Sequence, residues 1–137
     1  MGSNYLWTRL EDKVTHLVAE FPGVAGVCVA GLASSHRLNV RPDEVFPTAS
    51  SIKIHILAQL MLRAERGEVD LGKRVCVPPQ MRVAGSGILA SLDGDVELTI
   101  EDIATLMIIV SDNVATNICI DLAGMDETND LIRELGL

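Results

Sequence analysis

Residues 46–53 read FPTASSIK, and the rest of the chain is organised around this stretch. Phe46-Pro47 and the small residues after it are typical of a turn, whereas the apolar residues from Ile52 onward recur with the spacing of a helix. Ser50 and Lys53 are three residues apart, so in a helix both lie on one face, about one turn from each other. The stretch therefore predicts a turn that leads directly into a helix, with a hydroxyl and an amine within reach of each other.

This pair of residues can perform nucleophilic chemistry. A serine hydroxyl attacks a carbonyl only when a base takes its proton, and a lysine can do so if burial or neighbouring charge keeps it neutral. The N–H groups and the dipole at a helix start also favour negative charge that develops there. We therefore predict that Ser50 is the nucleophile and Lys53 its base. Taken alone, Ser-x-x-Lys is a weak pattern that is more typical of a helix cap followed by a solvated lysine.

A second polar motif, Ser111-Asp112-Asn113, separates two apolar segments that we expect to be helices, at residues 100–110 and 114–122. Taken alone it fits an ordinary turn between helices, because all three residue types favour caps and turns. Ser86 lies between two glycines, in a sequence that is first of all typical of a flexible turn.

Together, Ser-x-x-Lys and Ser-Asp-Asn resemble the penicillin-recognising serine hydrolases, and class A β-lactamases in particular. Phe46-Pro47, residues 63–75 (RAERGEVDLGKRV) and residues 98–102 (LTIED) are also similar to that family, in the order in which the family has them. The similarity covers nearly the whole chain. It implies an α+β fold of the β-lactamase/transpeptidase type, in which a helical lobe accompanies an N-terminal helix and a β-hairpin of an antiparallel sheet. That sheet is incomplete in this chain.

The resemblance also implies roles for the candidate catalytic residues. Ser50 would attack a carbonyl and form an acyl-enzyme, with Lys53 as base either directly or through a water. Ser111 would pass a proton between Lys53 and the leaving nitrogen.

Two further residues are expected to bind substrate. Asn113 would donate its amide to the substrate side chain and help to fix Lys53, and Ser86 would lie at the mouth of the cleft. Asp112, between Ser111 and Asn113, is expected to anchor the turn and not to touch substrate. The resemblance implies no cofactor and no metal.

The pattern along the chain predicts two domains, residues 1–45 and 46–137. The first has a helix at 4–21, a strand at 24–30 that is buried on both faces, and an antiparallel neighbour at 38–40. The second has a helix at 51–66, an irregular segment at 74–90, and a helix whose start is capped by Thr99 with Asp102. Asp126 is expected to cap the last helix in the same way.

Composition excludes several kinds of partner. The formal net charge of −8 argues against nucleic acid and anionic membranes, and no apolar run approaches the roughly 18 to 20 residues of a membrane span. The three cysteines, Cys28, Cys76 and Cys119, are scattered singly, so we expect reduced, buried side chains and no disulfide or zinc site. Together with the lack of a secretory signal at residues 1–4, the reduced cysteines favour a cytoplasmic chain.

In class A β-lactamases the next segments are a loop with the deacylating glutamate and a strand with Lys-Thr-Gly, which are not among these 137 residues. We therefore expect the N-terminal half of a serine hydrolase, completed by a complementary C-terminal segment or by a second copy of the chain. The expected substrate is a small-molecule β-lactam or a related amide or ester. The alternatives are a D-alanyl-D-alanine carboxypeptidase or an esterase of the same fold, and a non-catalytic, truncated pseudo-enzyme.

Overall fold

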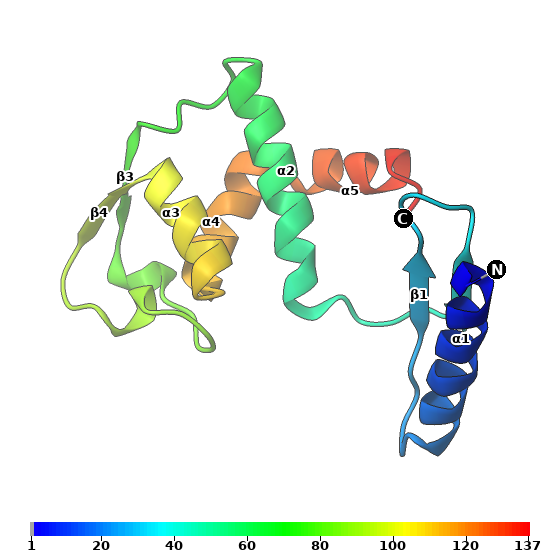
Figure 1. The fold of residues 1–137 in the computed structure, drawn as a ribbon. Helices are drawn as coiled ribbons and strands as arrows, with labels where there is room; N and C mark the ends of the chain where they lie inside the picture. Colours follow the sequence, from blue (N-terminus) through cyan, green and yellow to red (C-terminus); the bar gives the residue numbers. More distant parts are fainter. Residues whose placement is uncertain (1) are drawn as a thin grey trace. The chain divides into compact units, whose positions relative to one another are not determined.

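The computed structural model describes residues 2–137, with side chains from Asn4 onward. The chain forms two compact units, Met1–Pro47 and Thr48–Leu137, whose elements are labelled in Figure 1. The predicted domain boundary between residues 45 and 46 stays a prediction. The prediction of no secretory signal at residues 1–4 includes Met1, which lies outside the described residues. In the described part of the chain, no helix is long and apolar enough to cross a membrane.

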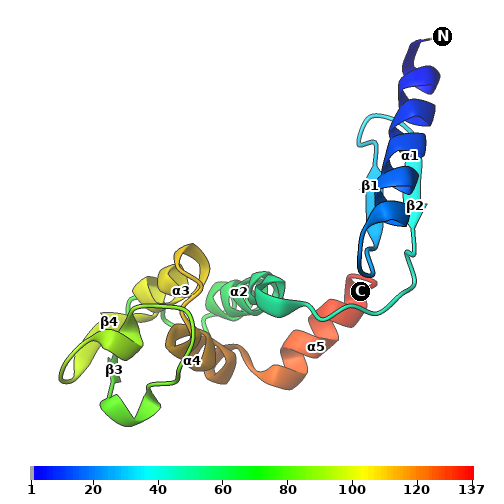
Figure 2. The ribbon, with the colours of Figure 1, turned by 90° about the horizontal axis from the view of Figure 1, so that it is seen from below.

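The first unit is a helix beside a two-stranded hairpin, as predicted. Helix α1 (Gly2–Glu20) lies along strands β1 (Val27–Ala30) and β2 (Arg37–Val40) in both views of the ribbon (Figures 1 and 2). The strands are antiparallel, with Val27 opposite Val40. The Trp7 ring stacks on His36, at 5.3 Å between ring centroids, and so joins the helix to the hairpin.

The predicted burial of the first strand on both faces is wrong in this unit. The strand begins at Val27, not at residue 24, and its residues alternate between half-buried and exposed. A two-stranded sheet with one covering helix protects only one face, so the other side of each strand remains open. Leu38 is the buried apolar side chain of this hairpin.

The second unit is mainly helical and contains the main apolar core. Its longer helices are α2 (Ile52–Glu65), α3 (Ile100–Ile109), α4 (Asn113–Ala123) and α5 (Met125–Glu134). The 3₁₀ turns are η1 (Ala49–Ser51), η2 (Pro79–Met81) and η3 (Leu89–Ser91). Helices α2, α3 and α4 pack together around aliphatic side chains that are almost fully buried, among them Leu60, Ile103, Met107 and Cys119.

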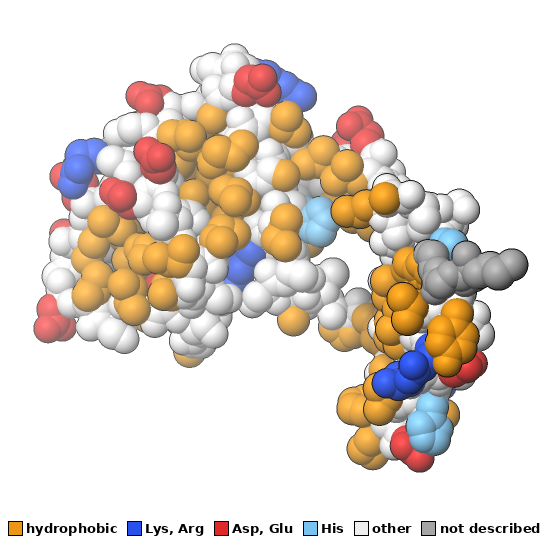
Figure 3. All heavy atoms as spheres, viewed as in Figure 1, with side chains coloured by type: hydrophobic (Ala, Val, Ile, Leu, Met, Phe, Trp, Pro, Cys, Tyr) orange, Lys and Arg blue, Asp and Glu red, His pale blue; other side chains and the backbone are white. Residues whose placement is uncertain are grey.

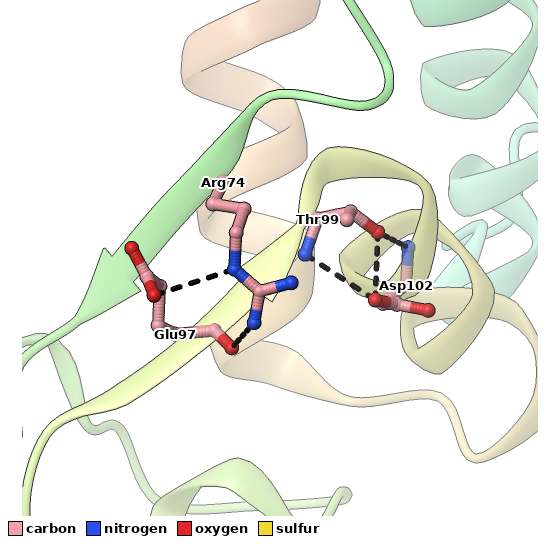
Figure 4. Close-up of polar contacts among 4 residues, drawn as sticks. All are labelled: Arg74, Glu97, Thr99 and Asp102. Carbon is pink, nitrogen blue, oxygen red and sulfur yellow. Dashed lines mark hydrogen bonds and ion pairs between the residues drawn. The ribbon is translucent and has the colours of Figure 1, made fainter.

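A second hairpin in this unit replaces part of the segment that was predicted to be irregular. Strand β3 (Arg74–Val77) pairs in antiparallel register with β4 (Val96–Thr99), with Arg74 opposite Thr99. The Arg74 guanidinium donates to the Glu97 carboxylate at 3.3 Å and to the Glu97 backbone carbonyl at 2.9 Å (Figure 4). The strands are short and a long loop separates them, so the local signals of a hairpin turn are missing.

The start of α3 has the predicted capping box (Figure 4). The Asp102 N–H donates to the Thr99 hydroxyl oxygen at 3.0 Å, and the Thr99 hydroxyl donates to the Asp102 carboxylate at 2.7 Å. The Thr99 side chain and then its N–H hold the pKa of Asp102 below its usual range. The expected Asp126 cap is wrong, because Gly124 is the N-cap of α5 and Asp126 lies inside the first turn. The single residue Gly124 joins α4 to α5, which leaves no loop for a later cap.

The cysteines differ from the prediction that all three are buried. All are free thiols, but only Cys119 is buried, whereas Cys28 and Cys76 are exposed. Both exposed cysteines lie on strands of two-stranded sheets, at exposed positions of each strand's burial pattern. Burial raises the pKa of the Cys119 thiol to about 12.

This difference predicts selective alkylation of the native protein. At pH 8, iodoacetamide should modify Cys28 and Cys76, whereas Cys119 should react only after unfolding, because its thiol is buried and protonated. Peptide mass mapping after a short pulse, with and without guanidinium chloride, measures this. Modification of Cys119 in native protein at the rate of Cys76 would show that α4 does not pack as described.

Candidate functional site

The predicted nucleophile lies at the turn before α2. Ser50 is in η1 and exposed, and Lys53 is in the first turn of α2, with only 6% of its surface exposed. Neither η1 nor α2 has a side-chain cap, so the alternative reading of Ser50 as a helix cap does not describe this turn. Ala49 has a φ of 45°, in the left-handed region that non-glycine residues rarely adopt. Such strain is common where a backbone is held in one conformation for function.

The structure joins Ser50 to Lys53 through Ser111. The Ser50 and Ser111 hydroxyl oxygens are 2.9 Å apart, and Lys53 Nζ donates to Ser111 Oγ at 2.7 Å. Lys53 Nζ also donates to the Ser111 carbonyl at 2.8 Å and to Asn113 Oδ1 at 3.3 Å. The sequence predicted direct reach between Ser50 and Lys53, but the described hydrogen bonds form a chain of three residues. These hydrogen bonds form a continuous series of polar groups along which a proton can move.

Lys53 is a buried amine whose partners are all uncharged. It is in none of the ion pairs formed by residues 4–137. Its three acceptors are a hydroxyl, a backbone carbonyl and a side-chain amide oxygen. The Lys53 amine is therefore held in place by hydrogen bonds and not by an ion pair among the described residues.

Asp112 anchors the turn between α3 and α4, as expected. It is fully buried and is the N-cap of α4, where one carboxylate oxygen accepts the Ala115 N–H at 3.0 Å. The other oxygen accepts the N–H groups of Ile88 and Leu89 at 2.7 and 2.9 Å. Burial alone would raise the pKa of Asp112, but these N–H donors together lower it below its usual range.

The same anchor shapes the backbone of Ser111. This residue has a φ of 54°, which turns the chain sharply after α3 and directs its carbonyl and hydroxyl at Lys53. A strained residue persists where its surroundings determine its conformation. Here the buried carboxylate of the next residue, Asp112, fixes the conformation of Ser111.

The loop at residues 84–88 lies against the Ser111–Asn113 turn. The Asn113 N–H donates to the Ser86 carbonyl at 2.9 Å, and Asn113 Nδ2 donates to the Ala84 carbonyl at 3.4 Å. A Cβ on Gly87, which has a φ of +119°, would lie 2.6 Å from Asp112 Cα, and a Cβ on Gly85 would collide with the Asn113 amide. The glycines therefore permit close approach, and their flexibility is not the main reason for their presence.

Ser86 lies beside the other candidate site residues, but it contacts them through its backbone. Its carbonyl holds Asn113, and its side chain is exposed. Its expected role in substrate binding stays a prediction. The Ala84 carbonyl was not predicted as part of the site, because a backbone acceptor leaves no signal in the residue type.

His16 and His36 do not join this site. His16 pairs with Glu20 on α1, and His36 contacts Asn4 and Trp7 in the first unit. Among the described residues, no group of three or more His, Cys, Asp or Glu could hold a metal ion.

Known proteins resemble this chain over most of its length. The family described as "Beta-lactamase enzyme family" matches residues 9–137. Beta-lactamase SME-1 of Serratia marcescens is 28% identical over 126 residues, which are 90% of this chain and 42% of that protein. Beta-lactamase BRO-1 of Moraxella catarrhalis is 27% identical over 138 residues, which are 97% of this chain and 43% of that protein.

Solved structures also match nearly the whole of this chain with about half of their own length. A β-lactamase from Sphaerobacter thermophilus superposes with a TM-score of 0.86 at 33% identity, over 95% of this chain and 48% of that one. A protein named PBP-A superposes with a TM-score of 0.85 at 36% identity, over 95% of this chain and 50% of that one. A point mutant of PBP-A was solved as an acyl-enzyme complex with penicillin G. The predicted fold class is confirmed, and the chain spans about half the length of these solved chains.

Replacing Asp112 should destabilise the second unit. Asp112→Ala leaves the buried N–H groups of Ile88, Leu89 and Ala115 without acceptors, and we expect a loss of at least about 2 kcal/mol in the free energy of unfolding. Urea unfolding followed by circular dichroism measures this loss. The exposed Asp93 offers a matched control, since Asp93→Asn should change the free energy by less than about 0.5 kcal/mol. Equal stabilities for the two variants would contradict the anchoring role.

The lowered pKa of Asp112 predicts the direction of acid sensitivity. Its carboxylate stabilises the folded state above its unfolded pKa of 3.8, and this contribution is lost as the pH falls through the lower folded value. Asp112→Asn, which carries no titrating group there, should therefore be less stable than the wild type at pH 7. The difference should narrow below pH 3.8, and urea unfolding measured between pH 7 and pH 2.5 tests it. A difference that grows on acidification would have the wrong sign.

Proposed function

The chain belongs to the beta-lactamase enzyme family, class A, and we propose that it carries the acylation site of a serine hydrolase that opens β-lactams. The observation that supports this most directly is the hydrogen-bonded chain from Ser50 through Ser111 to Lys53. The proposed activity is that of a complete fold, of which this chain supplies about half.

The proposed reaction begins with proton transfer along the hydrogen bonds that join Ser50, Ser111 and Lys53. For this step Lys53 must be the neutral amine, with the Ser111 hydroxyl donating to its Nζ across the 2.7 Å contact. The Ser50 proton then moves to Ser111 Oγ while the Ser111 proton moves to Nζ, and Ser50 Oγ attacks the carbonyl carbon of the lactam. The carbon–nitrogen bond then breaks, and the nitrogen takes a proton back from Lys53 through Ser111. The product is an ester between Ser50 and the opened substrate.

Asn113 supports this reaction in two ways in the proposal. Its Oδ1 accepts from Lys53 Nζ, which keeps the amine directed at Ser111. Its Nδ2 makes only a long contact of 3.4 Å to the Ala84 carbonyl, so it can turn to a substrate amide at little cost. Ser86, in the same loop, would border the entrance.

Acylation also needs donors for the developing oxyanion. The family resemblance assigns one of them, and the deacylating glutamate, to segments outside these 137 residues. Losing one oxyanion donor costs roughly 2.7 to 4 kcal/mol of transition-state stabilisation. We therefore propose that the C-terminal half of the fold, in the same polypeptide or in another, completes the site, and that residues 1–137 by themselves acylate slowly.

A second candidate function is a penicillin-binding enzyme that is acylated but deacylates slowly, such as a D-alanyl-D-alanine carboxypeptidase. The similarity to PBP-A, one form of which holds penicillin G as an acyl-enzyme, favours this candidate. Turnover of nitrocefin separates the two, because a β-lactamase releases the acyl group repeatedly and a penicillin-binding enzyme gives a single burst.

Covalent labelling tests the nucleophile. A fluorescent penicillin should add to Ser50, as seen by intact mass and peptide mapping, and Ser50→Ala should abolish the adduct without changing stability. The neighbouring Ser51, whose hydroxyl donates to the Thr48 carbonyl, is the matched control, and Ser51→Ala should still be labelled. An adduct that persists in Ser50→Ala would show that another residue is the nucleophile. Wild-type chain that stays unlabelled even with a complementary half would favour the pseudo-enzyme.

Labelling rates test the base. Lys53→Met should slow acylation by about 10²–10⁴-fold, which is the usual contribution of a positioned general base. Lys73→Met removes an exposed lysine from the same unit and should label at the wild-type rate. Equal rates for the two variants would remove Lys53 from the mechanism.

A further inference from the structure

Arg82 lies just before the loop that holds Asn113 and takes no part in the proposed proton transfer. The residue is half-buried, and its Nη2 donates to the Gly94 carbonyl at 2.6 Å. Its Nε is buried without an acceptor among the described residues, so within this set the Gly94 carbonyl is the one acceptor of the side chain. A hydrogen bond from a charged donor is about twice as strong as a neutral one. Arg82 therefore joins two segments that are 12 residues apart in sequence.

The contact between Arg82 and Gly94 holds one end of the loop beside the site. The other end is anchored by Asp112, which accepts the N–H groups of residues 88 and 89. Residues 83–87 lie between these two anchors. A short segment with both ends fixed has few conformations available, so its backbone groups stay in place.

The backbone of this segment lies directly against Asn113. The Asn113 N–H donates to the Ser86 carbonyl at 2.9 Å, and Asn113 Nδ2 donates to the Ala84 carbonyl at 3.4 Å. A Cβ on Gly85 would collide with the Asn113 amide, so nothing separates the loop backbone from that side chain. A shift of residues 83–87 therefore moves the acceptors that Asn113 uses.

We propose that Arg82 is a positioning residue of the acylation site, which holds residues 83–87 so that Asn113 is directed at Lys53 and at the substrate amide. The contact from Lys53 Nζ to Asn113 Oδ1 is long, at 3.3 Å, so a small displacement of the amide breaks it. The inference rests on the proposed function, because the contact between Asn113 and the substrate is part of that proposal.

A role for Arg82 in attracting an anionic partner has less support. The chain has 11 basic and 19 acidic residues, and its net charge is −8. Basic side chains are scattered over the face of the described residues that Figure 3 shows. Nucleic acid and anionic membranes are bound by clustered basic side chains. The Arg82 guanidinium is instead half-buried and directed at a backbone carbonyl.

Hydrogen exchange tests whether Arg82 holds the loop. In Arg82→Ala the Asn113 N–H should exchange at least about tenfold faster than in the wild type, because its acceptor, the Ser86 carbonyl, is held less firmly. Arg74→Ala is the matched control, since Arg74 Nη2 also donates to a backbone carbonyl of the same unit, that of Glu97 at 2.9 Å. This control should leave the Asn113 rate unchanged. Exchange followed by NMR at residue resolution measures the rates, and circular dichroism shows whether the variants fold.

Rescue by lysine separates this role from other effects of the substitution. The contact uses one donor nitrogen and not the two-nitrogen fork of arginine, so Arg82→Lys can supply it. Exchange at Asn113 in Arg82→Lys should therefore return towards the wild-type rate. Arg82→Gln, whose side chain is shorter and uncharged, gives the same comparison if Arg82→Ala does not fold.

Two β-lactams test the effect on the substrate. Penicillin G has a side-chain amide that Asn113 can bind, whereas 6-aminopenicillanic acid has a free amine in its place. Arg82→Ala should slow the labelling of Ser50 by penicillin G about tenfold, and labelling by 6-aminopenicillanic acid much less. Intact mass measured against time gives both rates. A purely stabilising role for Arg82 would slow both reactions equally.

The outcomes separate this inference from the proposed function. Unchanged exchange at Asn113 in Arg82→Ala, the same increase in Arg74→Ala, or an increase that Arg82→Lys does not reverse would overturn the positioning role. Equal slowing with the two β-lactams would overturn its link to the substrate. Wild-type protein that neither β-lactam labels would count against the proposed function alone, because the exchange rates would still decide whether Arg82 positions the loop.

Discussion

A buried carboxylate holds the site together. Asp112 accepts hydrogen bonds from the start of α4 and from the backbone at residues 88–89, and so fixes two segments that are distant in sequence. Ser111 and Asn113, on either side of it, are placed so that both contact Lys53. Burying a charge is costly unless it is fully hydrogen-bonded, which this one is. A residue with no proposed part in the chemistry therefore determines where the chemical groups lie.

The helices and the polar motifs could be predicted from the sequence because their signals are local. The apolar spacing after Ile52, the Thr99–Asp102 capping box and the turn-forming residues at Ser111 each depend on contacts within a few positions. The family resemblance then joined Ser50 and Lys53 to Ser111, which spacing alone could not have done. What the residues could not show was the order of the hydrogen bonds, in which Ser111 lies between the other two.

The features that were missed depend on pairing across long stretches of chain. Strands β3 and β4 are four residues each and are separated by a loop with two 3₁₀ turns, so neither has the length or the adjacent turn that predicts a hairpin. The cysteine prediction failed for a related reason. The strand that carries Cys28 was predicted to be buried on both faces, and Cys76 was predicted to lie in an irregular segment, but both lie on sheets of only two strands. Burial is a property of the assembled sheet and not of the segment.

Polar and apolar groups differ in what they need from the rest of the chain. The Ser50–Ser111–Lys53 hydrogen bonds close between residues of one unit, because polar groups need partners only at hydrogen-bond distance. Apolar side chains need buried area, and neither the two small sheets nor exposed residues such as Ile54 and Ile109 find enough of it within the described residues. The hydrogen-bonded groups of the second unit can therefore hold one geometry while apolar side chains of the same unit stay exposed.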